Sequence, residues 1–245
     1  MDRSTEVQSP KRLIEALREQ IARLEGPRPP WGDEPAVSSG WGPLDRLLPE
    51  RGFRWGTLVE WLAPGEGAGA ETLALGTARV ACREGGALVV LDSAREFYPP
   101  AAARLGIDLD GLIVVRASSQ ADAIWALDQS LRCPAVAAVL ARPRALEART
   151  FRRLQLAAEQ GGGLGLLLRP ESARHEPSWA EVRLLVEPLP VAGVGGPRRL
   201  RIELLRSRGG TSGGSVELEV DHETPALYPP ARLAHPANRR RAARA

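Results

Sequence analysis

The sequence predicts an α/β fold in which helices flank a mostly parallel central sheet that ends in antiparallel strands. Between residues 57 and 170, short apolar runs alternate with amphipathic stretches, a rhythm typical of strand–helix–strand units. Runs such as ALVVLD and AVAAVLA are almost wholly apolar, as strands covered on both faces require. After residue 180 the helical periodicity stops, and strand-like segments separated by glycine-rich stretches follow.

These patterns predict the individual elements in order. Strands are expected at residues 57–63, 87–92, 112–115, 135–141 and 163–168. Helices are expected between them, at residues 71–83, 100–105, 120–131 and 145–159. The last three strands are VRLLVEPLP, RRLRIELLRS and SVELEV. Alternation of apolar and polar residues in the last two predicts a half-exposed sheet edge.

A separate helix is expected near the N-terminus, at residues 10–25. Its apolar face is formed by Leu13, Leu17, Ile21 and Leu24. The helix is too short to be stable alone, so this face docks either on its own domain or on a partner. A linker rich in proline and glycine follows. We therefore expect an N-terminal helix and linker at 1–36, a core at 37–224 and an irregular basic tail at 225–245.

Composition excludes several classes of protein. The net charge is +3, but the last eleven residues carry four arginines and no acid, which leaves +3 − 4 = −1 for the rest. No apolar run is long enough to span a membrane and the N-terminus is polar, so a cytoplasmic location is expected. Two cysteines and three scattered histidines give no metal-ligand spacing. We expect no metal and no cofactor.

The stretch TLVEWLAPGEGAGAETLAL has the layout of a phosphate loop: a strand, a glycine-rich turn and a helix start. In the pattern G-x-x-x-x-G-K-[ST], backbone N–H groups hold the phosphates, the lysine reaches the β and γ phosphates, and the hydroxyl binds magnesium. Here only the second glycine survives at its position. The degenerate loop comprises Pro64, Gly65, Gly67, Gly69, Ala70 and Glu71.

Two of these replacements oppose nucleotide binding. Ala70 stands at the lysine position and removes a positive charge, while Glu71 places a carboxylate at the hydroxyl position. Like charges about 4 Å apart repel by roughly 4 kcal/mol at an effective dielectric constant near 20. Glu71 suits the first turn of a helix whose N-terminus holds no anion. The loop is either a remnant kept for packing or an unusual site in which a metal bridges Glu71 to a phosphate.

The residues around this loop resemble the core of the RecA recombinase. A glycine-bracketed LD-x-x-L helix and a strand ending in glutamate precede the loop, and the matching positions are Gly42, Leu44, Asp45, Leu48, Gly56, Val59 and Glu60. The stretch VVLDSAREFYPPAAARLGIDLDGLIV is similar to the RecA segment that carries the catalytic glutamate. That glutamate position is Ala94, and the terminal aspartate position of the Walker B strand is Ala141. The resemblance implies a degenerate ATPase that is not an enzyme.

The segment FRRLQLAAEQGGGLGLLLRP further resembles the ImuA family. This resemblance implies a non-catalytic accessory protein of SOS-induced translesion DNA synthesis and mutagenesis. Its implied partners are a Y-family-like adaptor, ImuB, together with RecA and, indirectly, an error-prone polymerase α subunit. The alternatives are a DNA-dependent ATPase or recombinase paralogue, and a SulA-like inhibitor of cell division. The long DNA-binding loop of RecA is reduced here to ESARHEPSW.

Two basic segments are candidate contacts for DNA or an acidic partner. The first is the strand with Arg198, Arg199 and Arg201, for which a solvated strand face is the plainer interpretation. The second is the tail with Arg239, Arg240 and Arg241, which either binds DNA weakly, docks a partner or only aids solubility. The tryptophans at 31, 41 and 55 form either a recognition strip or ordinary packing. Both cysteines, Cys82 and Cys133, are expected to be buried.

Overall fold

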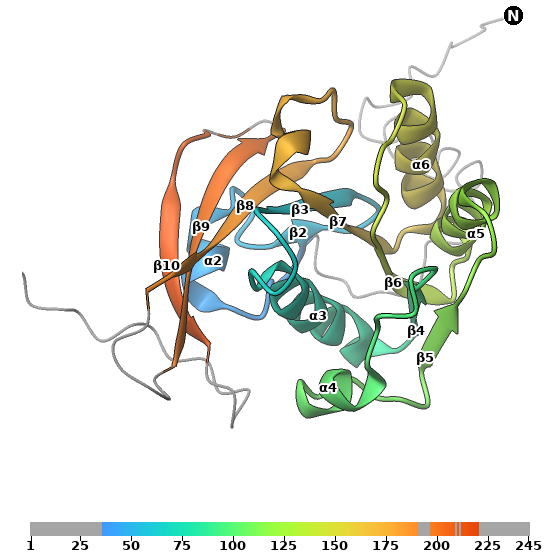
Figure 1. Ribbon diagram of the computed structural model, residues 1–245, viewed down its shortest axis with the longest axis horizontal. Coiled ribbons are helices and arrows are strands. Elements are labelled where there is room, and N and C mark those ends of the chain that lie inside the picture. The colour runs from blue at the N-terminus through green and yellow to red at the C-terminus, as the bar shows by residue number, and fades with distance from the viewer. Residues whose placement is uncertain (1–35, 191–196, 209, 211, 221–245) are drawn as a thin grey trace, which may run out of the picture.

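The computed structural model describes residues 36–190, 197–208, 210 and 212–220, and these residues form a helix-flanked sheet (Figure 1). The main sheet has eight strands in the order β10-β9-β8-β3-β7-β6-β4-β5. All pairings from β8 to β5 are parallel, and β8, β9 and β10 pair antiparallel. The strands are β3 (Leu58–Ala63), β4 (Ala87–Leu91), β5 (Leu112–Val115), β6 (Val136–Ala141), β7 (Leu164–Pro170), β8 (Val182–Leu189), β9 (Arg198–Ser207) and β10 (Ser215–Val220). The predicted fold class is confirmed.

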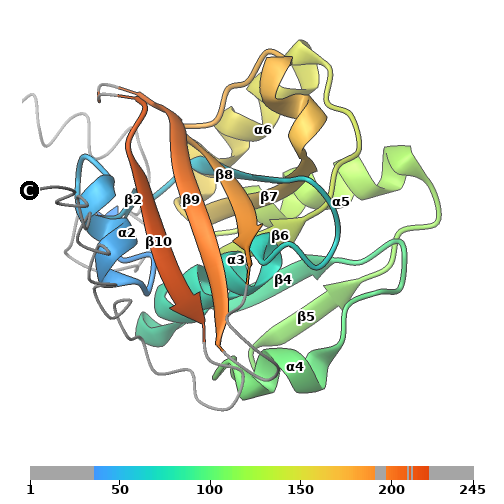
Figure 2. The same cartoon turned by 60° about the vertical axis from the view of Figure 1, so that its left-hand side comes forward.

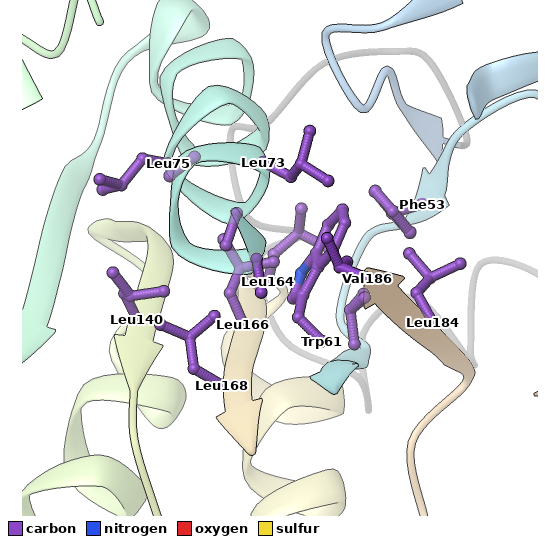
Figure 3. Close-up of a cluster of buried hydrophobic side chains, with 14 of the residues drawn as sticks. Phe53, Trp61, Leu73, Leu75, Leu140, Leu164, Leu166, Leu168, Leu184 and Val186 are labelled. Atoms are coloured by element: carbon purple, nitrogen blue, oxygen red, sulfur yellow. The ribbon is translucent and has the colours of Figure 1, made fainter. Parts of the chain in front are cut away.

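Helices cover both faces of the parallel part of the sheet. Side chains of α3 (Ala70–Ala81) pack with Val59 and Trp61 of β3, whereas α5 (Gln120–Arg132) and α6 (Ala148–Gly161) pack with Leu58 on the opposite face. This division follows from the alternation of side chains along a strand. The short helix α4 (Pro99–Arg104) lies between β4 and β5 in the chain. Figure 3 shows Trp61 beside Leu164, Leu166 and the side chains of α3.

A buried tryptophan packs the N-terminal part of the core against α3. Trp41, which precedes α2 (Gly42–Leu47), is buried against Gly76, where a Cβ atom would lie only 1.8 Å from the indole Cη2. Asp45 holds the preceding turn by accepting hydrogen bonds from Ser39 N at 2.7 Å and Ser38 Oγ at 2.6 Å. A two-stranded sheet of β1 (Ala36–Val37) and β2 (Phe53–Arg54), which the sequence analysis did not predict, completes this segment.

The antiparallel strands extend the sheet beyond β3 and end in an open edge at β10 (Figure 2). Leu200, Ile202 and Leu204 of β9 are buried, while the alternate residues lie half-buried or exposed. Leu218 of β10 is buried between exposed or half-buried neighbours. The predicted alternation of this edge is therefore confirmed.

Three details differ from the sequence predictions or lie beyond them. Helix α6 begins at Ala148 rather than at residue 145, and Cys133 is exposed because it follows the last turn of α5 as its C-terminal cap. Two short 3₁₀ helices, η1 (Cys82–Glu84) and η2 (Glu171–His175), end α3 and follow β7. The predicted helix at 10–25, Trp31 and the basic tail lie outside the described residues. In the part of the chain that is described, no helix is long and apolar enough to cross a membrane.

Candidate functional site

The loop between β3 and α3, residues 64–71, occupies the position of a phosphate loop at the carboxyl end of the sheet. Pro64, Gly65 and Gly67 are exposed, and the loop then turns inward so that Gly69 and Ala70 are buried. Gly69 adopts a left-handed backbone with φ of 103°, a conformation that strongly favours glycine, and α3 begins at the next residue. The local geometry of a strand, a glycine turn and a helix start is thus retained.

Packing from β9 holds this loop in place. A Cβ atom on Gly69 would lie 2.7 Å from both Cδ atoms of Leu200. The side chain of Leu200 is fully buried, so it has little room to move away from the loop. The glycine therefore serves two purposes: it permits the turn, and it leaves room for the antiparallel part of the sheet.

An ion pair joins Glu71, at the position of the metal-binding hydroxyl, to the residue that follows the end of β6. The Glu71 carboxylate lies in the first turn of α3, and its Oε1 is 2.5 Å from Nη2 of Arg142. Arg142 directly follows Ala141, the last residue of β6. In a nucleotide-binding loop, the hydroxyl at position 71 and the aspartate of the neighbouring strand converge on magnesium. Here a guanidinium supplies the positive charge, and the carboxylate is already neutralised.

The turn after β4 keeps its acidic residue but lacks a general base. Asp92 is buried, and its Oδ1 accepts hydrogen bonds from the backbone N–H groups of Glu96 at 2.8 Å and Phe97 at 3.2 Å. These bonds fix the turn that carries Ala94, whose exposed methyl group stands at the glutamate position. A methyl group accepts no proton, so Ala94 itself cannot act as a general base.

Loop 64–71 borders a cavity of about 500 Å³. Its charged lining is nearly balanced, because Arg142, Arg144, Arg169 and Arg198 face Glu66, Glu71 and Glu96. Of these arginines, Arg142 is bound to Glu71, and Arg169 is bound to carboxylates behind the cavity. A site for a triphosphate needs a clear excess of positive charge. Among the described residues, no group of acids, histidines and cysteines is arranged to hold a metal ion.

A buried network of charges lies beside this cavity. Glu60 on β3 is fully buried between Arg169 of β7, whose Nη1 is 2.8 Å away, and Arg183 of β8, whose Nε is 2.6 Å away. Ser178 Oγ also donates to Glu60 at 2.7 Å, and Arg169 Nη2 donates to Glu176 at 2.6 Å. Burial alone lowers the pKa of Arg169, but the hydrogen bonds and charges of the two glutamates outweigh it and raise the pKa. The two glutamates therefore favour the charged form of Arg169.

This network fixes the segment that follows β7, residues 171–181. Arg183 Nη2 donates to the carbonyl of Ala173 at 2.6 Å, and Arg206 donates to the carbonyl of Ser178 at 3.2 Å. The ring of Trp179 lies between two guanidiniums, 4.8 Å from Arg152 and 5.9 Å from Arg208. Each stacking contact stabilises the segment modestly. This short segment is thus bound to four strands, β3, β7, β8 and β9, and to α6.

The three arginines expected as contacts on β9 have different surroundings. Arg199 binds Glu217 of β10 at 2.7 Å and lies 3.9 Å from Glu219. Arg201 is paired in register with Glu217 on one side and Glu187 on the other. Arg198 lies at the cavity beside loop 64–71. The two remaining candidate groups, the apolar face of residues 10–25 and the tail arginines, lie outside the described residues.

Sequence reasoning missed the most connected polar residues of the site. Arg142, Arg169 and Arg183 were not singled out, although each interrupts or directly follows an apolar strand. Burying an arginine is costly unless it is paired, so an arginine within LLLRP or VRLL is a signal for a buried partner. That signal, combined with Glu60 in the neighbouring strand, would have pointed to the network.

The fold and the loop at the end of β3 define a RecA-like α/β protein. RecA of Chlorobaculum parvum is 35% identical over 101 residues, which cover 41% of this chain and 29% of that protein. A protein named ImuA from Caulobacter vibrioides strain NA1000 / CB15N is 32% identical over 201 residues, or 74% of this chain and 82% of that protein. The chain therefore belongs to the ImuA family.

A solved structure supports the fold assignment. The crystal structure of the RadB recombinase matches with a TM-score of 0.60 at 19% identity, covering 76% of this chain and 97% of that one. At this identity the likeness concerns the fold alone. No family model matches the chain.

Proposed function

We propose that this ImuA-family chain is a non-catalytic accessory protein of SOS-induced translesion DNA synthesis. It acts through contacts with a Y-family-like adaptor, with RecA or with both, and through the adaptor it serves an error-prone polymerase α subunit. The observation that carries this proposal is the Glu71–Arg142 ion pair, in which the carboxylate of the degenerate loop is paired within the chain. Family membership supports the mutagenesis context.

The chemistry of phosphoryl transfer supports a non-catalytic role. Such catalysis depends on positioning and on neutralising the charge of the transferred group, which a lysine and a magnesium ion normally provide. Loop 64–71 has Ala70 at the lysine position, and its carboxylate is paired internally with Arg142. A nucleotide would have to break that ion pair and would then face the freed carboxylate. The unfavourable electrostatics oppose both binding and turnover.

The first experiment measures ATP hydrolysis by the purified full chain, with and without single-stranded DNA. We expect no rate above background. Ala70→Lys alone should not create activity, because Ala94 supplies no general base and Ala141 supplies no carboxylate for magnesium. A rate that is removed by Gly65→Trp, at a loop position where an added Cβ meets nothing within 4 Å and which lines the cavity, would overturn the non-catalytic part of the proposal.

The second experiment measures complex formation with the purified adaptor and RecA proteins of the same organism, by analytical size exclusion and calorimetry. We expect a complex with at least one of them that is insensitive to added ATP and magnesium. Absence of any complex with either protein would overturn the accessory role. Weak DNA binding through the arginines of the tail is a further part of the proposal, and its test is given in the Discussion.

A further inference from the structure

A second cavity lies beside the first, between the carboxyl ends of β4 and β6 and the start of α5. Its volume is about 310 Å³, within the range of small binding sites. Apolar side chains make up more of its walls than polar ones, and five of its twelve lining residues are polar or charged. The lining residues used below are Asp92, Ala94, Ala123, Ile124, Ala141 and Arg144.

The apolar character of this cavity follows from two of the replaced catalytic positions. Ala94 and Ala141 both line it, so methyl groups stand where a RecA-like ATPase would carry carboxylates. Ile124 and Leu127 of α5 supply the facing wall. An apolar cavity of about 150 Å³ is large enough to bind benzene. This cavity therefore has room for an aromatic or a large aliphatic side chain.

The polar groups of the cavity restrict what else the ligand carries. Asp92 Oδ2 is buried, and among the described residues no group donates a hydrogen bond to it; the nearest cation is Arg116 Nε at 3.6 Å. The Asp92 carboxylate lines the cavity and disfavours an acidic group of the ligand beside it. Arg144 is exposed at the rim and has no carboxylate within ion-pair distance in the described part of the chain, so it favours an acidic group there.

The two cavities adjoin at the carboxyl end of the sheet, where both are lined by Ala94, Arg142, Pro143 and Arg144. The larger cavity carries three glutamates beside four arginines, and this mixture of charges does not suit the uniformly negative backbone of a nucleic acid. A polypeptide fits better: it combines an apolar side chain, backbone N–H donors and side chains of either charge on one extended chain.

We propose that the cavity between β4, β6 and α5 binds a segment of a partner protein, with an aromatic or large aliphatic side chain inserted and an acidic neighbour at Arg144. This inference rests on the proposed accessory function and names the surface through which that function works. The replaced catalytic positions thereby acquire a role of their own, as the floor of a peptide-binding site.

The test uses the purified full chain and overlapping synthetic peptides that cover the adaptor of the same organism, with binding measured by calorimetry alongside the intact adaptor. Ala123→Leu fills the cavity from α5 and is expected to weaken binding of the adaptor, and of the responding peptide, at least tenfold. Ala121→Leu is the matched control, because Ala121 is exposed on the same helix and does not line the cavity. The control should bind like the wild type.

A second pair of variants keeps the proposal falsifiable if Ala123→Leu perturbs folding. Arg144→Glu should weaken binding about tenfold, whereas Arg149→Glu, an exposed residue of α6 outside the cavity, should not. If the adaptor binds and all four variants bind equally well, the cavity is not the site, while the accessory function stands. If the wild type binds no adaptor, this inference falls, and the accessory function then depends on RecA alone.

Discussion

Replacing the buried Glu60 tests whether the charge network positions the segment at residues 171–181. Glu60→Gln keeps the shape of the side chain but leaves two guanidiniums, those of Arg169 and Arg183, beside a neutral amide. Removing one partner of a buried ion pair costs about 3–5 kcal/mol. Glu176 still neutralises part of Arg169, so we expect a loss of about 3 kcal/mol. For a chain of this size that corresponds to a fall in Tm of roughly 6–12 °C.

The assay is thermal unfolding followed by circular dichroism, combined with hydrogen exchange of the backbone amides at 171–181. The matched control is Glu176→Gln, whose side chain is 41% exposed and whose ion pair is therefore worth about 1 kcal/mol or less. We expect faster exchange in this segment for Glu60→Gln and nearly unchanged exchange for the control. If Glu60→Gln lowers the unfolding free energy by less than 1 kcal/mol, the network does not hold the segment, and the reasoning fails.

Four further predictions concern packing, reactivity and the two ends of the chain. Gly76→Ala should displace Trp41 and destabilise the fold by about 1–3 kcal/mol. The control Gly42→Ala should not destabilise it, because only the end of the Arg46 side chain lies near that position. Equal Tm values for the two variants would refute this prediction. Burial raises the pKa of Cys82 to about 11, so at pH 8 only Cys133 should react with iodoacetamide, and Cys133→Ser should abolish the fast labelling. If the apolar face at residues 10–25 docks on a partner, Leu17→Glu should abolish partner binding without lowering Tm. A lower Tm with binding intact would instead indicate that this segment packs on its own core. Deleting residues 236–245 should remove most of the affinity for DNA. It should also flatten the plot of log affinity against log salt concentration, whose slope for four phosphate contacts is roughly −0.7 × 4, or about −3. An unchanged slope would exclude the tail as the DNA-binding site.

The α/β fold was predictable because its strands are almost wholly apolar and regularly spaced. β4 and β6 read as continuous apolar runs, and the structure buries nearly all of their residues. The two-stranded sheet β1–β2 was not predictable, because strands of two residues carry no periodicity. Cys133 was placed wrongly because its helix-like position suggested burial, whereas it follows the last turn of α5 as the C-terminal cap and is exposed.

The candidate site was predictable in its position but not in its interactions. The glycine turn at Gly69 marks the loop locally, since strand, turn and helix are adjacent in the chain. The partners that determine its chemistry are distant: Glu60 and Arg169 are 109 residues apart, and Arg142 comes from a different strand than Glu71. Such pairings depend on the order of strands in the sheet, which one sequence does not specify.

The internal pairing of charges also bears on how the protein is regulated. A ligand shifts a conformational equilibrium only by the difference between its affinities for the two states. We expect a nucleotide to gain little affinity at loop 64–71, because Arg142 is already paired there with Glu71. Asp92 is likewise already bound to two backbone N–H groups. We therefore predict that ATP does not control the association of this protein with its partners.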